Sequence, residues 1–297
     1  MDALHRLAVC CTALLPLACG GDNPHPRELA PLVLASTPST FAAGCSGSTA
    51  RRETLYRDSA VEPFVAVDPA DADHLVGVWQ QDRWSGGGAS GLLAGVSFDG
   101  GHTWARAAAP FTRCTGGGRA RGGDFERASD PWVAVGTDGT VWQSGLAFDR
   151  QGPGGQAILV SRSTDRGLGW SDADAVARDD DPDVALDKET ITVDPLDPQR
   201  VYVVWDRLTG LTNPDPTLGT GPAWLARTTD GGATWEPARS IHDPARTPRR
   251  SGTRSSRSRT ARSSTSSPSS RTRASSCRTR RSRCCARSTT APAGRRR

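Results

Sequence analysis

The chain has 297 residues, of which 36% are hydrophobic and 23% charged, enough for one large all-β domain or two ordinary domains. Its net charge of +5 conceals a division between two parts of the chain. Residues 246–297 contain 17 arginines and no acidic residue, which leaves residues 1–245 with 20 basic and 32 acidic side chains. An acidic body gives no support to a nucleic-acid partner, so we predict none.

Residues 1–19 have the pattern of an export signal. The apolar run 7–18 is too short to span a bilayer and suits the hydrophobic part of a signal peptide. The sequence Leu-Ala-Cys-Gly-Gly resembles a bacterial lipobox, in which Cys19 would be lipidated. We therefore predict an exported protein that is either secreted or held by this anchor alone as a lipoprotein at the outer membrane, in the periplasm or at the cell surface.

Residues 20–60 are rich in Pro, Ala, Ser and Thr and show no periodicity, so we predict a linker there. Within the acidic body, Cys45 and Cys114 are the only pair of cysteines outside the signal. In an oxidising compartment they would form a disulfide. The sequence does not give the Cα separation that a disulfide requires, so two unpaired cysteines are the alternative.

Residues 61–245 contain three repeats of short strand-like segments. Runs of β-branched and aromatic residues are separated by Asp-Pro, Asp-Gly and Gly-Gly, and no stretch has a sustained helical period. An octapeptide of the pattern Ser/Thr-x-Asp-x-Gly-x-Thr-Trp recurs, and its aspartates lie 66 and 65 residues apart. The predicted strands are 62–69, 74–79 and 91–97, then 130–135, 140–144 and 157–161, then 190–195, 200–205 and 223–227.

The octapeptide suits a hairpin turn, because the aspartate accepts backbone N–H groups and glycine tolerates positive φ. The residues that carry the pattern are Ser97, Asp99, Gly101, Thr103 and Trp104; Ser163, Asp165, Gly167 and Trp170; and Thr228, Asp230, Gly232, Thr234 and Trp235. We expect each Trp to pack into the core. The second copy has Gly169 where Thr is expected, so its turn should be looser.

These octapeptides resemble the Asp-boxes, or bacterial neuraminidase repeats, of the sialidase-like β-propellers. In that family the box is structural and lies in the turn between the third and fourth strands of a blade. The resemblance covers roughly residues 60–240. It implies an all-β fold, a β-propeller of four-stranded antiparallel blades, with about three complete blades of an incomplete six-bladed ring.

The Arg-rich residues 246–297 form a low-complexity segment that we expect to be disordered. When residues 251–268 are rewritten as codons, GC-rich ones over 257–268, and shifted by one base, they encode two strand-like runs around a Pro-Asp-Gly turn, at the place where a fourth blade would begin. We therefore favour a frameshift after about residue 245. A basic arm that binds nucleic acid or another anionic surface is the alternative.

The resemblance to sialidases does not extend to their catalytic residues. That family uses three arginines that hold the substrate carboxylate, an Asp as the general acid, and a Tyr nucleophile activated by a Glu. This chain lacks the Phe/Tyr-Arg-Ile-Pro motif that carries the first of those arginines. Polar residues at strand ends could line a central pocket, although solvated loop charges are the simpler interpretation. The candidates are Asp82, Arg83, Glu126, Asp130 and Arg207.

We predict no metal and no cofactor. The histidines have no metal-ligand spacing, and the acidic run 179–183 lacks the glycine and terminal Glu of a calcium-binding loop, which favours a surface turn.

Two functions follow from these patterns. The first is an exported, lipid-anchored module that binds a glycan or a cell-surface protein without catalysis. The second is a glycoside hydrolase of exo-α-sialidase type whose catalytic half is missing from this chain. The sequence does not predict the oligomeric state.

Overall fold

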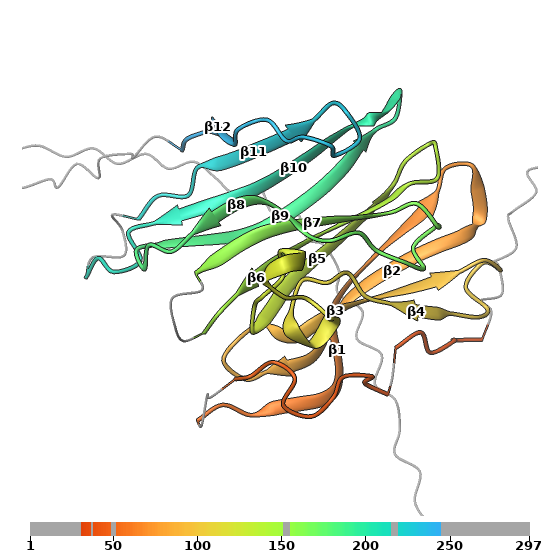
Figure 1. Cartoon of the computed structure of the whole chain (residues 1–297), viewed down its shortest axis with the longest axis horizontal. Helices are drawn as coiled ribbons and strands as arrows, with labels where there is room; N and C mark the ends of the chain where they lie inside the picture. The colour runs from red at the N-terminus through yellow and green to blue at the C-terminus, as the bar shows by residue number, and fades with distance from the viewer. Residues whose placement is uncertain (1–30, 37, 49–51, 151–154, 215–218, 245–297) are drawn as a thin grey trace, which may run out of the picture. The chain divides into compact units, whose positions relative to one another are not determined.

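Figure 1 presents a computed structural model of the chain, which describes residues 31–36, 38–48, 52–150, 155–214 and 219–244. The predicted signal peptide with Cys19 and the Arg-rich segment 246–297 lie outside the described residues. Among the described residues, no helix has the length and apolarity needed to cross a membrane.

The described residues form three successive antiparallel blades of four strands each, so the all-β propeller prediction is confirmed. The only helical elements in the described part are two single 3-10 turns between the first and second blades, η1 (Arg113–Thr115) and η2 (Arg119–Arg121). The blades consist of β1 (Leu55–Asp68), β2 (Asp71–Trp84), β3 (Ala89–Ser97) and β4 (Ala105–Ala107); β5 (Arg127–Val135), β6 (Val141–Phe148), β7 (Gln156–Ser163) and β8 (Asp174–Asp179); and β9 (Val184–Asp194), β10 (Asp197–Thr209), β11 (Ala223–Thr228) and β12 (Arg239–His242).

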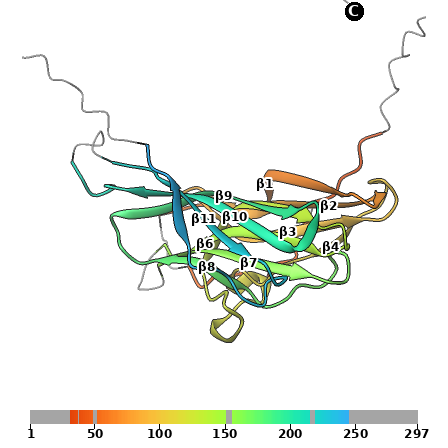
Figure 2. The ribbon, with the colours of Figure 1, turned by 90° about the horizontal axis from the view of Figure 1, so that it is seen from above.

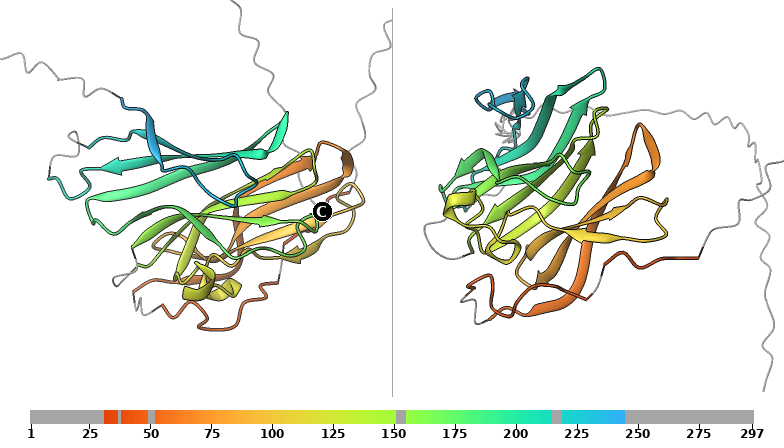
Figure 3. Two further views of the ribbon diagram at one scale, coloured as in Figure 1. Left: turned by 45° about the horizontal axis from the view of Figure 1, so that its top comes forward. Right: turned by 45° about the vertical axis from the view of Figure 1, so that its right-hand side comes forward.

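The blades pack face to face, with the innermost strands β1, β5 and β9 as neighbours. Figure 3 shows the three sheets spread as a fan, and in Figure 2 strands β9 to β11 overlie the green strands of the second blade. A single residue pair, Ala89 with Ala128, joins the edges of the first two blades. Burial of apolar side chains between neighbouring sheets is therefore the main force that holds the blades together.

Three apolar clusters fill the spaces between the blades, two of them between the first and second blades and one between the second and third. Between the first and second blades, Val76 and Val78 of β2 pack with Val133 of β5, and all are nearly inaccessible. Between the second and third blades, Trp142 of β6 packs with Trp205 of β10. The residues between these positions are also largely apolar, such as Trp79 of β2 and Trp132 of β5, as expected for strands that are covered on both faces.

The three octapeptides form the turns between the third and fourth strands of the three blades, as expected from the resemblance. In the first, Thr103 donates from its backbone nitrogen to Asp99 over 2.8 Å and from its hydroxyl over 2.6 Å. The third has the same two bonds, from Thr234 to Asp230, at 2.9 and 2.6 Å. These hydrogen bonds lower the pKa of both aspartates to about 2.

The second octapeptide retains only part of this network. Gly169 donates from its backbone nitrogen to Asp165 over 2.7 Å, but it has no hydroxyl for a second bond. Trp170 still packs against the apolar clusters between the first and second blades, and Trp235 packs against the cluster between the second and third. The second turn is thus formed without the hydroxyl-to-aspartate hydrogen bond that the first and third turns have.

The predicted linker 20–60 requires correction, because its later part is structured. Strand β1 begins at Leu55, and Phe41 packs in a small cluster with Trp79 and Leu93. Cys45 forms a disulfide with Cys114, across a sequence separation of 69 residues. Low apolar content hid this segment in the sequence, since one buried aromatic and one covalent bond hold it.

Candidate functional site

The three innermost strands share one irregularity at equivalent places. In each, two consecutive residues face a single residue of the neighbouring strand, which is a β-bulge. The bulges place Glu62 and Pro63 opposite Trp79, Asp130 and Pro131 opposite Gly145, and Lys188 and Glu189 opposite Trp205. A bulge changes the direction of its side chains, and here all three bulges lie where the innermost strands meet.

The backbone at these bulges is strained in the same way. Glu62, Asp130 and Lys188 have φ values of 51°, 51° and 54°, a region that residues with a side chain seldom occupy. Each such residue costs on the order of 1–3 kcal/mol, and such residues concentrate at functional sites. Three equivalent strained residues around one pocket make this the candidate site.

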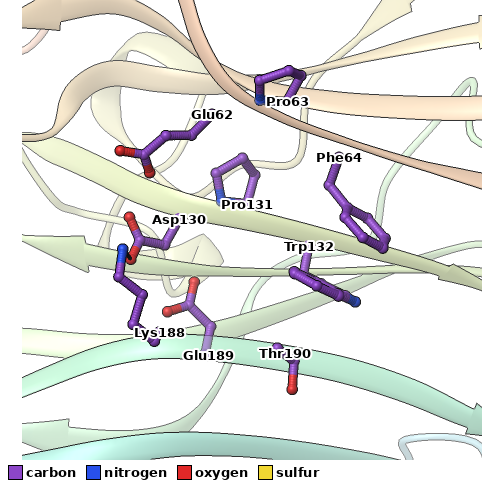
Figure 4. Close-up of a pocket in the computed structure, with 9 residues that line it drawn as sticks. All are labelled: Glu62, Pro63, Phe64, Asp130, Pro131, Trp132, Lys188, Glu189 and Thr190. Atoms are coloured by element: carbon purple, nitrogen blue, oxygen red, sulfur yellow. Dashed lines mark hydrogen bonds and ion pairs between the residues drawn. The ribbon is translucent and has the colours of Figure 1, made fainter. Parts of the chain in front are cut away.

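The pocket between the bulges has a volume of about 230 Å³. One part of its lining is apolar, where the rings of Phe64 and Trp132 stack with centroids 3.7 Å apart. The other part carries the carboxylates and the lysine, whose side chains converge in Figure 4. The lining residues are Glu62, Pro63, Phe64, Asp130, Pro131, Trp132, Lys188, Glu189 and Thr190.

Asp130 is the centre of the polar part. Lys188 donates to it over 2.9 Å and the hydroxyl of Ser129 over 2.6 Å. Burial opposes ionisation of Asp130, but these two hydrogen bonds outweigh it and lower the pKa of the carboxyl. Asp130 is therefore an ionised group at neutral pH, paired with the Lys188 ammonium.

The pKa values of Glu62 and Asp187 are shifted in the opposite direction to that of Asp130. Partial burial, reinforced by the nearby Asp130 carboxylate, raises the pKa of both carboxyls. Glu62 accepts a hydrogen bond of 2.6 Å from Gln80, which in turn accepts one from Arg83. The polar part of the pocket is thus supported by side chains from β2.

Glu189 is the most unusual residue of the site. It is 2% exposed, and neither carboxyl oxygen has a hydrogen-bond partner among the described residues. Burial raises the pKa of this carboxyl well above its usual range and outweighs the backbone amides of Glu189 and Leu146, which lower it. Burial therefore favours the protonated form of Glu189.

The structure separates the five candidate residues predicted from the sequence. Only Asp130 lines the pocket, and Arg83 is linked to it through Gln80 and Glu62.

The other three have partners elsewhere. Asp82 is buried and accepts from the hydroxyl of Ser39 over 2.6 Å. Glu126 pairs with the fully buried Arg127 at 3.0 Å. Arg207 pairs with Asp179 at 2.6 Å. The contacts of Asp82 and Arg207 join segments that are distant in sequence, and Glu126 balances the charge of the buried Arg127 beside it, so the geometry of all three is that of structural residues.

Sequence reasoning missed Glu62, Lys188 and Glu189 as site residues. A signal for the first was present: Glu-Pro-Phe-Val-Ala-Val at 62–67 recurs as Asp-Pro-Trp-Val-Ala-Val at 130–135. An acid before Pro and an aromatic residue, repeated in the first strand of two blades, marks equivalent positions. The third blade has Lys-Glu-Thr at 188–190, which matches only by position.

The acidic run 179–183 forms turns. Asp183 accepts from the hydroxyl and the backbone nitrogen of Thr212, and Asp181 accepts from the backbone nitrogen of Asp183. Within the described ranges, no group of three or more His, Cys, Asp or Glu side chains has the arrangement of a metal site.

Neither a protein-family model nor a curated protein matches the chain. Solved structures match parts of it. An α-L-arabinanase of Penicillium chrysogenum in complex with arabinobiose is 15% identical, over 71% of this chain and 54% of that one, with a TM-score of 0.45. A protein of unknown function from Dyadobacter fermentans is 18% identical, over 61% and 50%, with a TM-score of 0.43. A Hadza microbial sialidase is 18% identical, over 60% and 37%, with a TM-score of 0.41.

The chain therefore spans between 37% and 54% of the length of these three structures. Because every TM-score is below 0.5, the fold assignment rests on the strand order and pairing of this chain.

Proposed function

We propose that this chain is a carbohydrate-binding module of the propeller type, whose ligand occupies the pocket between the three bulges. The observation that carries the proposal is the division of that pocket into an aromatic part and a polar part. A sugar ring has apolar C–H faces and hydroxyl edges, so it needs both kinds of surface. Phe64 and Trp132 would contact the ring, while Asp130 and Glu62 would accept hydroxyl hydrogen bonds.

The size of the pocket favours one sugar ring. Its volume of about 230 Å³ lies below the roughly 300–1,000 Å³ typical of pockets for drug-sized ligands. The proposal includes export and a lipid anchor at Cys19, which are supported by the N-terminal sequence alone. The partner would then be a glycan outside the cytoplasm, and the anchor would be the only membrane contact.

Calorimetric titration of the full chain with methyl glycosides of neutral sugars tests this proposal. We expect Asp130→Asn to weaken binding about tenfold or more, because a carboxylate that accepts hydroxyl hydrogen bonds is worth on the order of 1.5–3 kcal/mol. Asp73→Asn is the matched control, since Asp73 is an exposed acid near the start of β2, outside the pocket. Equal binding by both variants would refute the assignment of the pocket, and binding of a cell-surface protein but no sugar would refute the ligand class.

Glycoside hydrolysis is the second candidate, and one observation favours it. The pKa of Glu189 is raised and that of Asp130 is lowered in the same pocket, the opposite shifts that a glycosidase gives to its acid and its base. The lining contains neither Arg nor Tyr, so the sialidase form of this candidate has little support from the pocket. Release of nitrophenol from nitrophenyl glycosides, abolished by Glu189→Gln and retained by Asp73→Asn, would establish hydrolysis.

A further inference from the structure

We propose that the pocket selects a sugar that carries a free amino group, with the ammonium held by the buried carboxyl of Glu189. This inference rests on the proposed function, because it specifies the class of sugar that the same pocket takes. Two independent observations lead to it: the balance of charges in the pocket, and the lack of partners around Glu189.

The charges in and beside the pocket are unbalanced. Apart from the protonated Glu189, three carboxyls, of Glu62, Asp130 and Asp187, lie in or beside the pocket with one ammonium, that of Lys188. That cation already pairs with Asp130. The guanidinium nearest in the network, that of Arg83, donates to Gln80. The site is therefore short of positive charge, and a cationic ligand would supply it.

Glu189 shows where such a cation would be bound. Its carboxyl lines the pocket, is 2% exposed and has no hydrogen-bond partner on either oxygen. In Figure 4 it points toward the side of Asp130 and Lys188. A buried polar group without a partner costs on the order of 1–3 kcal/mol, so unsatisfied groups of this kind are rare and call for an explanation.

An ammonium suits the two unpartnered oxygens of Glu189 better than a hydroxyl does. It offers three donors and a positive charge, so it would favour the ionised form of Glu189, which accepts on both oxygens. The aromatic pair Phe64 and Trp132 forms the other side of the pocket and would contact the ring that bears the amine. An acetylated amine has no charge and would lose this contact.

The same charges exclude acidic sugars. The carboxylate of a sialic acid would meet Asp130 and the other carboxyls, and the lining offers no guanidinium to bind it. Like charges in a partly buried pocket cost far more than at an exposed surface. The pocket therefore differs in ligand charge from the sialidases that the octapeptides resemble.

Titration of the full chain with glucosamine, N-acetylglucosamine, glucose and N-acetylneuraminic acid at pH 6.5 tests the proposal. We expect glucosamine to bind at least about tenfold more tightly than glucose or N-acetylglucosamine, and N-acetylneuraminic acid not to bind. Repeating the titration in buffers of different ionisation enthalpy should show release of up to one proton per glucosamine bound, as Glu189 ionises.

Glu189→Gln should remove both the preference for glucosamine and the proton release, while Asp73→Asn should keep both. Urea unfolding of each variant confirms that it is folded. Equal affinity for glucosamine, glucose and N-acetylglucosamine would overturn this inference and leave the proposed function standing. A preference for glucosamine that persists in Glu189→Gln would have the same meaning. Failure of every sugar to bind would overturn both.

Discussion

Gly169 offers a direct test of how the octapeptide turns stabilise the blades, through the substitution Gly169→Thr. The first and third octapeptides have Thr at this place, and its hydroxyl donates to the turn aspartate over 2.6 Å in both. Gly169 has no positive φ, so a side chain fits its backbone conformation. A Cβ there would lie 2.8 Å from an oxygen of Asp165, the mobile end of a side chain.

The expected gain has two parts. Replacing glycine where the backbone allows it stabilises a protein by about 0.4–1 kcal/mol through the unfolded state. A new hydrogen bond from the hydroxyl to Asp165 adds about 0.5–1 kcal/mol, the lower part of the usual range because the turn is exposed. We therefore expect Gly169→Thr to raise the free energy of unfolding by about 1–2 kcal/mol, equivalent to a Tm increase of roughly 2–8 °C.

Gly169→Ala is the control, because it changes the backbone contribution without adding a hydroxyl. Urea unfolding of the two variants and the parent protein separates the contributions, with Thr expected above Ala by the value of one hydrogen bond. If Thr is no more stable than Ala, the hydroxyl bond seen in the other two turns does not stabilise them, and the reasoning fails.

Two further predictions concern charge and covalent structure. Because the pKa of Asp99 and of Asp230 is about 2 in the fold and near 3.8 when unfolded, their contribution to stability is complete above about pH 4 and disappears as the pH falls toward 2. Urea unfolding between pH 2 and 5 should therefore show that the double variant Asp99→Asn, Asp230→Asn loses less free energy of unfolding on acidification than the parent protein does. The same loss in both proteins would contradict this. Replacing Cys45 and Cys114 with Ala opens a loop of 69 residues and should lower stability by about 4 kcal/mol. A urea midpoint that does not move would show that the disulfide restricts the unfolded chain far less than its loop length implies.

Much of the blade structure was predictable from local sequence. Each predicted strand overlaps one of the inner three strands of its blade, because these are buried on both faces or alternate in burial and are rich in Val, Ile and Trp, although most observed strands are longer, as β1 and β9 begin at Leu55 and Val184. The outer strands β4, β8 and β12 were not located individually. They are short and largely exposed, so nothing selects an apolar pattern in them.

The candidate site was less predictable, for a different reason. A bulge is a relation between two strands, and the register that leaves Glu62 and Pro63 opposite one residue is set by the partner β2. Asp130 was predicted from its place at a strand end, which is a local signal. The burial of Glu189 depends on contacts among three blades, and no pattern in one segment specifies it.

The repeated bulge also has a consequence for how this pocket could change. In every blade the extra residue is absorbed at the bulge, so the strand resumes its pairing with β2, β6 or β10 and its core residues keep their positions. A different side chain at Glu62, Asp130 or Lys188 would alter the pocket and leave the apolar clusters between the blades untouched. The polar side chains of the pocket thus lie outside the apolar clusters, whereas its aromatic residues Phe64 and Trp132 pack against them, so substitutions at the three bulge positions would change the polar part of the pocket alone.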